Sequence, residues 1–143
     1  MLSDIKIDGQ AAAQLAAADW PCLKTIALNV EWWNPDVNLG SEGAAALAKA
    51  HWPDLEHFNI NSNQIGNAGM ELLSKGAIWP RLKVLDLAST GVTAAGAAAL
   101  ALSAAQWPKL TDLTLNRISA AGAAALATAS WPALSTLQLS KCI

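Results

Sequence analysis

The sequence predicts an α/β solenoid in which short parallel strands alternate with slender helices, and three observations lead to this prediction. First, five Trp-Pro dipeptides each precede apolar residues at positions three, six and eight after the tryptophan. Second, the successive tryptophans are 32, 27, 28 and 24 residues apart, a period typical of solenoids. Third, each unit carries an apolar residue followed eight positions later by leucine. We therefore expect residues 1–143 to form one repeat domain.

The strand of each unit is expected directly after its Trp-Pro. Proline lacks an amide hydrogen, and that loss does least damage at the start of a strand. Because the connections between units are short, successive strands are expected to lie parallel. The tryptophans recur at one place between helix and strand, so we expect them to stack and pack one edge of the core. They are Trp20, Trp52, Trp79, Trp107 and Trp131.

The helix of each unit is expected between two apolar anchors spaced eight apart. A small residue lies halfway between them, on the same helix face, where it lets the helix press close to what it covers. The anchors and the small residues are Ile7-Ala11-Leu15, Leu39-Gly43-Leu47, Ile65-Gly69-Leu73, Val92-Gly96-Leu100 and Ile118-Gly122-Leu126. The position after the first anchor suits a helix N-cap in all five units: Asp8, Gly40, Gly66, Thr93 and Ser119. The alanines between them favour helix formation.

The combined pattern, L-x-x-L-x-L-x-x-N-x-I-x-x-x-G-x-x-x-L, resembles the leucine-rich repeat of the helix-bearing, ribonuclease-inhibitor-like type. The GAAALA strings at Gly43, Gly96 and Gly122 also resemble the GALA-type repeats of some bacterial effectors. This resemblance implies a right-handed β-α superhelix with a parallel sheet on its concave side and alanine-rich helices on its convex side. It also implies a non-enzymatic protein-binding scaffold of leucine-rich-repeat type.

The repeat units have approximate boundaries at 1–19 (partial), 20–51, 52–78, 79–106, 107–130 and 131–143 (partial). Unit 20–51 has a loop six residues longer than its neighbours, and this loop contains the adjacent Trp32 and Trp33. Either these tryptophans fold back as a lid over the first repeats, or they form an aromatic contact site for a partner.

One loop position is expected to join neighbouring units. Asn63 occupies the asparagine position of the repeat, and its amide is expected to bond the backbone of neighbouring loops. Thr90 fills that position less well in the next unit. Unit 107–130 is two residues shorter and loses the position, so we expect the ladder of loop contacts to break there.

Composition excludes several classes of function. The net charge is −2 with both signs scattered, which leaves no electrostatic footprint for nucleic acid or an anionic membrane. The longest apolar run, 94–102, is too short to span a bilayer, and the first residues do not resemble a signal peptide. Cys22 and Cys142 lie four strand steps apart, roughly 20 Å, which is too far for a disulfide. We therefore expect free thiols and a cytoplasmic, reducing location.

The residues between the apolar strand positions are expected to face outward in columns. One column is Thr25, His57, Val84, Asp112 and Thr136; the next is Ala27, Asn59, Asp86, Thr114 and Gln138; a third is Asn29, Asn61, Ala88, Asn116 and Ser140. His57, Asn59, Asp86 and Asp112 form either a polar partner-binding patch, with Trp32 and Trp33 at its rim, or an ordinary solvated sheet face.

No enzyme, metal site or cofactor is predicted. His57 with Asp86 or Asp112 resembles a base and its orienting acid, but no serine or cysteine nucleophile lies beside them. Cys-x-x-Cys and His-x-x-x-His pairs are missing from the sequence, as are phosphate-binding loops.

The last unit carries Leu134, Leu137 and Leu139 without a following helix, which predicts self-association through the C-terminal strand unit. The leading function is a scaffold that binds a protein partner, which the sequence does not identify. The alternatives are a structural or truncated repeat array, or a recognition segment of a larger effector or ligase-adaptor protein.

Overall fold

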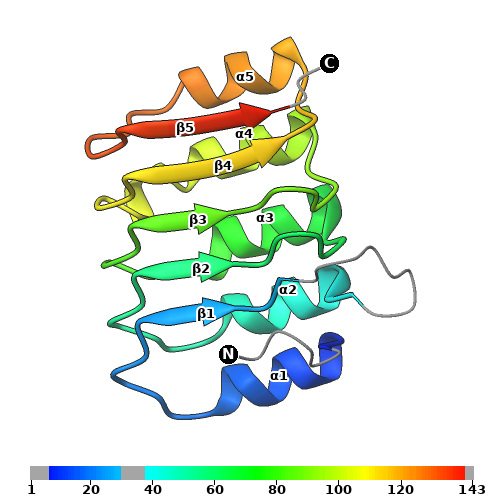
Figure 1. Cartoon of the computed structure of the whole chain (residues 1–143), viewed down its shortest axis with the longest axis vertical. Coiled ribbons are helices and arrows are strands. Elements are labelled where there is room, and N and C mark those ends of the chain that lie inside the picture. The colour runs from blue at the N-terminus through cyan, green and yellow to red at the C-terminus, as the bar shows by residue number, and fades with distance from the viewer. Residues whose placement is uncertain (1–6, 30–37, 141–143) are drawn as a thin grey trace.

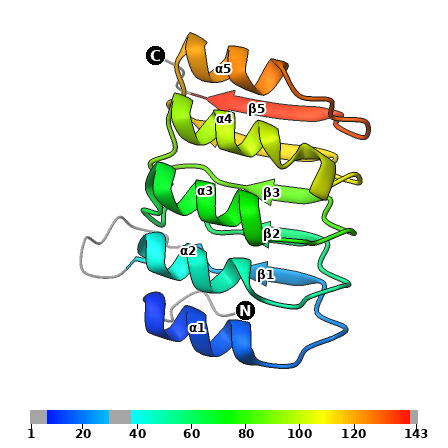
Figure 2. The same cartoon turned by 180° about the vertical axis from the view of Figure 1, so that it is seen from behind.

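The chain folds as two layers, a parallel sheet and a row of helices, in a computed structural model that describes residues 7–29 and 38–140. In order, the elements are α1 (Gly9–Ala17), β1 (Thr25–Ala27), α2 (Gly40–Ala48), β2 (His57–Asn59), α3 (Gly66–Gly76), β3 (Val84–Asp86), α4 (Ala94–Leu102), the 3-10 helix η1 (Ala104–Gln106), β4 (Asp112–Asn116), α5 (Ala120–Ala127) and β5 (Thr136–Ser140). Figure 1 shows the strands stacked along the long axis, and Figure 2 shows the helices covering their other face.

The sheet confirms the predicted fold class and register. Its strands run parallel in the order β1-β2-β3-β4-β5, which is also their order in the sequence. Leu85 pairs with Leu113, and Leu113 pairs with Leu137, as the fixed distance from each Trp-Pro requires. The outward columns pair likewise, with Thr25 opposite His57 and Asp86 opposite Thr114.

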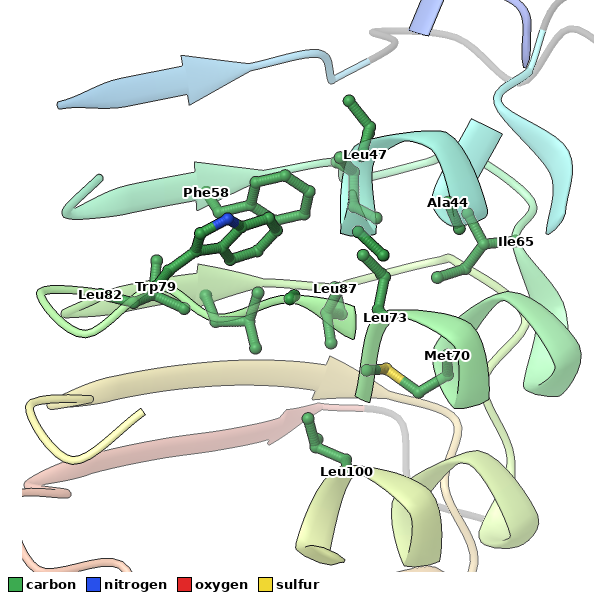
Figure 3. Close-up of a cluster of buried hydrophobic side chains, with 14 of the residues drawn as sticks. Ala44, Leu47, Phe58, Ile65, Met70, Leu73, Trp79, Leu82, Leu87 and Leu100 are labelled. Atoms are coloured by element: carbon green, nitrogen blue, oxygen red, sulfur yellow. The ribbon is translucent and has the colours of Figure 1, made fainter. Parts of the chain in front are cut away.

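The core lies between the two layers and is shared by all units. Trp52, Trp79 and Trp107 are fully buried and stack, with ring centroids 6.1 Å apart for the first pair and 6.5 Å for the second. Figure 3 shows Phe58 against Trp79, their centroids 4.7 Å apart, in the core between sheet and helices. The predicted tryptophan column is therefore confirmed at its centre. Toward the ends, Trp20 is 39% exposed and Trp131 is only partly buried.

The small residue at the middle of α3, Gly69, has the expected role. A Cβ added to Gly69 would lie 2.7 Å from Cβ of Ile65 and 3.2 Å from Cβ of Ala44 in α2. The first distance is shorter than real Cβ contacts, so a larger residue would not fit. Glycine at this position lets the backbone of α3 lie close to the Ile65 side chain and to α2. Figure 3 shows Ala44 and Ile65 side by side at this contact.

The helix starts differ from the prediction in two units. Asp8 and Ser119 are N-caps whose side chains accept from the amides of Ala11 and Gly122, as expected. Gly40 and Gly66 are instead the first residues of α2 and α3.

Both glycines have positive φ values, +62° for Gly40 and +65° for Gly66, and the N-cap positions are Leu39 and Ile65. The glycine is needed because the chain turns into the helix through the left-handed region, which side chains disfavour. Its role is thus conformational, and no capping acceptor is supplied at that position.

Thr93 is the N-cap of α4, but its own side chain does not cap the helix. The side chain of Asn67, in α3, replaces it. Its Oδ1 accepts from the amides of Thr93 and Gly96, each at 2.9 Å, and its Nδ2 donates to Oγ1 of Thr93 at 2.8 Å. The cap of one repeat is therefore provided by the preceding repeat, which ties the two helices together.

The loop contacts confirm the predicted role of Asn63, but they differ from the prediction in unit 107–130. Nδ2 of Asn63 donates to the carbonyl of Leu28 at 2.7 Å, and its Oδ1 accepts from the amide of Leu39 at 3.3 Å, so it bridges to the preceding loop. The side chain of Thr90 bonds only within its own loop, as a poorer substitute would.

The ladder does not break in unit 107–130, contrary to expectation. Asn116 takes over the contact between loops from a position two residues earlier than the asparagine position. Its Oδ1 accepts from the amide of Ser89 at 2.6 Å, and its Nδ2 donates to Oγ of Ser89 at 3.1 Å.

Candidate functional site

The outward face of the sheet is the candidate partner-binding surface. Two outward columns, the one that begins with Thr25 and the one that begins with Ala27, are exposed or partly exposed throughout. The reason is that strand side chains alternate between the core and solvent. The inward residues between them, such as Phe58, Leu85 and Leu113, are at most 2% exposed. The fold therefore places the predicted patch residues on one accessible surface.

The four patch residues lie on three neighbouring strands. Asn59 on β2 is directly opposite Asp86 on β3. His57 pairs with Val84, and Val84 pairs with Asp112, so His57 and Asp112 lie two strands apart in one column. Neighbouring strands are about 4.8 Å apart, so roughly 10 Å separates the backbones at these two residues.

Three of the four patch side chains, those of Asn59, Asp86 and Asp112, are held by local contacts. Oδ1 of Asn59 accepts from the amide of Asn61 at 2.9 Å, and Oδ1 of Asp86 accepts from the amide of Ala88 at 3.0 Å. These turns fix the side chains at the ends of β2 and β3.

Asp112 is held by its chain neighbour, since its Oδ2 accepts from Oγ1 of Thr111 at 2.7 Å. Among the residues that the structure describes, no ion pair involves Asp86 or Asp112. Their two negative charges are therefore available to a partner.

The strand-start edge of the sheet carries charges that neutralise one another. Nζ of Lys83 lies 3.3 Å from Oε2 of Glu56, and Arg81 lies 3.0 Å from Asp54. The hydrogen bond from Lys83 holds the pKa of Glu56 below its ordinary value of 4.5, and the charges of Lys83 and Lys24 act in the same direction. Asp54 and Glu56 at this edge are therefore both paired, unlike Asp86 and Asp112 in the patch.

The hypothesis of an acid–base pair at His57 gains no support from the geometry. Within 7–29 and 38–140, no hydrogen bond or ion pair joins His57 to Asp86 or Asp112. The same residues contain no group of three or more His, Cys, Asp or Glu side chains arranged to hold a metal ion.

Two predicted features lie outside the described residues. Trp32 and Trp33 fall in 30–37, and Cys142 falls in 141–143, so both the aromatic rim and the state of that thiol stay predictions. Cys22 is a free, exposed thiol.

A cleft that the sequence did not suggest lies at the loops that follow β2, β3 and β4. This loop-edge cleft has a volume of about 580 Å³ and is lined by Ser62, Gln64, Ser89, Gly91, Val92, Thr93, Asn116 and Arg117. Three of these residues, Ser62, Ser89 and Arg117, lie two positions after the last apolar strand residue of their units. That common position was the only signal in the sequence.

Comparison with known families identifies the repeat. The family model described as leucine-rich repeat matches residues 53–74, 81–101 and 108–127, which cover the strand, loop and helix of three successive units. A search of curated proteins finds no match. No helix in the described part of the chain is both long and apolar enough to cross a membrane. With five parallel strands in one sheet and a helix in each full unit, these matches identify the fold as a leucine-rich-repeat solenoid.

Proposed function

We propose that this chain is a non-enzymatic scaffold that binds a protein partner through the outward face of its sheet. The observation that supports it is the register of the strands, which gathers His57, Asn59, Asp86 and Asp112 on one accessible surface. Leucine-rich repeats in general suggest protein interaction, and the matched repeats make that the first class to test.

The charges of the patch favour a basic partner. Asp86 and Asp112 have no ion pair among the described residues, whereas Asp54 and Glu56 at the strand-start edge are paired. A partner segment that brings Lys or Arg gains complementary contacts here, and such contacts accelerate association and select among partners. Trp32 and Trp33 complete the proposal as aromatic anchors, because tryptophan is enriched where binding energy concentrates.

The finer assignments belong to the same proposal. The presence of a helix in each full unit supports the ribonuclease-inhibitor-like subtype. The free thiol of Cys22 is consistent with a cytoplasmic, reducing location.

The test is capture of protein partners on the immobilised 143-residue chain, followed by affinity measurement with a purified captured protein. Asp86→Asn/Asp112→Asn removes two charges from the sheet face, and Trp32→Ala/Trp33→Ala removes the aromatic rim. The matched control is Glu42→Gln/Glu71→Gln, which removes two exposed charges from α2 and α3. We expect both sheet-face variants to weaken binding at least tenfold while the control binds normally. Wild-type affinity in all three variants would show that the binding site lies elsewhere on the chain.

We also propose that two copies associate through the last strand unit. Leu137 on β5 is 44% exposed, whereas Leu85 and Leu113 at the same register are 2% and 1% exposed. Trp131 and Leu134 nearby are only partly buried. A second copy that presents the same strand unit covers these apolar side chains on both molecules, as a two-fold interface does.

A further inference from the structure

The loop-edge cleft contains an exposed cation and no acidic side chain among its described lining residues. The chain has two arginines, Arg81 and Arg117. Arg81 is paired with Asp54 at 3.0 Å, on the strand-start side of the sheet. Arg117 lies on the opposite side, where the strands end, and has no ion pair with any described residue. A guanidinium in a polar cleft without a counter-charge favours an anionic ligand.

The hydroxyl groups of Ser89 and Thr93 act as acceptors in the hydrogen bonds around the cleft, so their own protons are available to a ligand. Oδ1 of Asn116 accepts from the amide of Ser89, which fixes the orientation of the Asn116 amide. Its Nδ2 must therefore donate to Oγ of Ser89, and it does so at 3.1 Å. Oγ of Ser89 is thus an acceptor in this bond, and its own proton remains for another group.

Thr93, which also lines the cleft, repeats this arrangement. Oδ1 of Asn67 accepts from the amide of Thr93, so Nδ2 of Asn67 donates to Oγ1 of Thr93 at 2.8 Å. The hydroxyl proton of Thr93 is likewise left for a further acceptor. Asn67 already occupies the amides of Thr93 and Gly96, so the start of α4 contributes this hydroxyl rather than free amides.

The backbone of the cleft is strained in a regular way. Ser62, Ser89 and Arg117 have φ values of +66°, +55° and +58°. In this left-handed region glycine and asparagine have a lower conformational energy than other residues. All three lie at the same position of successive repeats, and all three line the cleft. Strained backbone of this kind clusters at active sites and ligand-binding positions.

We propose that the loop-edge cleft binds an oxyanion, a carboxylate or a phosphate, through the guanidinium of Arg117 and the hydroxyls of Ser89 and Thr93. The guanidinium supplies charge and a planar pair of donors, which match two oxygens of either group. The two hydroxyls supply further donors that the asparagines hold in place. This site is separate from the sheet-face patch, whose unpaired charges are negative.

The experiment is an NMR titration of the ¹⁵N-labelled full chain with sodium acetate and, separately, with inorganic phosphate. Chloride replaces each anion so that the ionic strength is constant, because a weak charged contact is screened by salt. We expect saturable shifts confined to the amides of Ser89, Gly91, Thr93 and their neighbours. Saturation with acetate identifies a carboxylate site, saturation with phosphate identifies a phosphate site, and either result supports the proposal.

Variants separate this site from general attraction to a cation. Arg117→Gln is expected to weaken binding about tenfold or more, since a charged hydrogen-bonding group is removed. Arg117→Lys keeps the charge but loses the planar donor pair, so it should fall between wild type and Arg117→Gln.

Arg81→Gln makes the same charge change at the other edge and should leave the titration unchanged. Shifts that never saturate with either anion, or equal losses in Arg81→Gln and Arg117→Gln, would overturn the proposal. Because the probe is a free anion, this result does not depend on whether the sheet face binds a protein.

Discussion

The indole rings of Trp79 and Trp107 stack across two repeats, with centroids 6.5 Å apart and planes inclined by 16°. Trp52 extends the stack on the other side of Trp79, at 6.1 Å. Trp79 therefore touches an aromatic ring on each neighbouring unit. Because the units of a solenoid contact only their immediate neighbours, this one ring takes part in both interfaces of its repeat.

Trp79→Ala is expected to destabilise the fold by about 3–5 kcal/mol, since the large buried ring leaves a cavity and both stacking contacts are lost. Trp20→Ala is the matched control, because Trp20 begins the first full unit but is 39% exposed, and it should cost about 1 kcal/mol. Urea unfolding followed by circular dichroism measures both. Similar losses for the two variants would contradict the prediction that the buried, stacked ring stabilises the fold more than the exposed one.

Asn63→Ala is expected to cost about 3 kcal/mol. The buried Asn63 side chain satisfies the carbonyl of Leu28 at 2.7 Å and the amide of Leu39 at 3.3 Å, and both groups lose a partner when it is removed. Thr90→Val is the control at the same position of the next unit. It removes one hydrogen bond within a single loop, so about 1 kcal/mol is expected. Chemical denaturation compares the two, and a larger loss for Thr90→Val would contradict the bridging role.

The pKa of Glu56 predicts a dependence on pH at the strand-start edge. The hydrogen bond from Lys83 lowers this pKa below 4.5 in the folded chain. The stabilisation from the pair is therefore fully present above the unfolded value and is lost as pH falls through the lower folded value.

Lys83→Met should raise the pKa of Glu56 toward 4.5 in an NMR titration of the side-chain carboxyl. Lys75→Met is the control, because Lys75 lowers the pKa of Glu71 on α3 by the same kind of hydrogen bond. It should move Glu71 and leave Glu56 unchanged. A Glu56 pKa that stays low in Lys83→Met would assign the shift to another group.

The strand order and register of the sheet could be predicted from the sequence because one spacing is constant in every unit. The last apolar strand residue always lies eight positions after the tryptophan, so the pairing of Leu85, Leu113 and Leu137 followed without any knowledge of the loops. The same distance placed His57 and Asp86 on the outward face. It did not show which side chains touch, because contacts across the sheet depend on rotamers and on local turns such as that of Asp86 with Ala88.

The loop-edge cleft escaped sequence reasoning for physical reasons. Serine and arginine carry no preference for positive φ, so Ser89 and Arg117 gave no sign of the left-handed backbone that shapes the cleft. Its hydrogen bonds join residues far apart in the chain, and Asn67 gave no indication that it caps α4 in the next repeat. The capping error at Gly40 has the same origin, since glycine suits both a cap and a left-handed turn.

Leu137→Lys is expected to abolish association between copies of this chain. Leu137 is 44% exposed at a position where Leu113 is buried, so two copies that meet at β5 bury this side chain twice, and a lysine there opposes its own counterpart. Light scattering over a range of concentrations should show wild-type mass rising toward a dimer and Leu137→Lys remaining monomeric. Leu102→Lys is the matched control, because Leu102 is the last residue of the helix α4 and is 86% exposed, so it also places a lysine at an exposed leucine but outside the strand unit. It should associate like wild type. A wild-type chain that stays monomeric at high concentration rules out this interface, and equal effects of the two lysines assign the change to general surface charge.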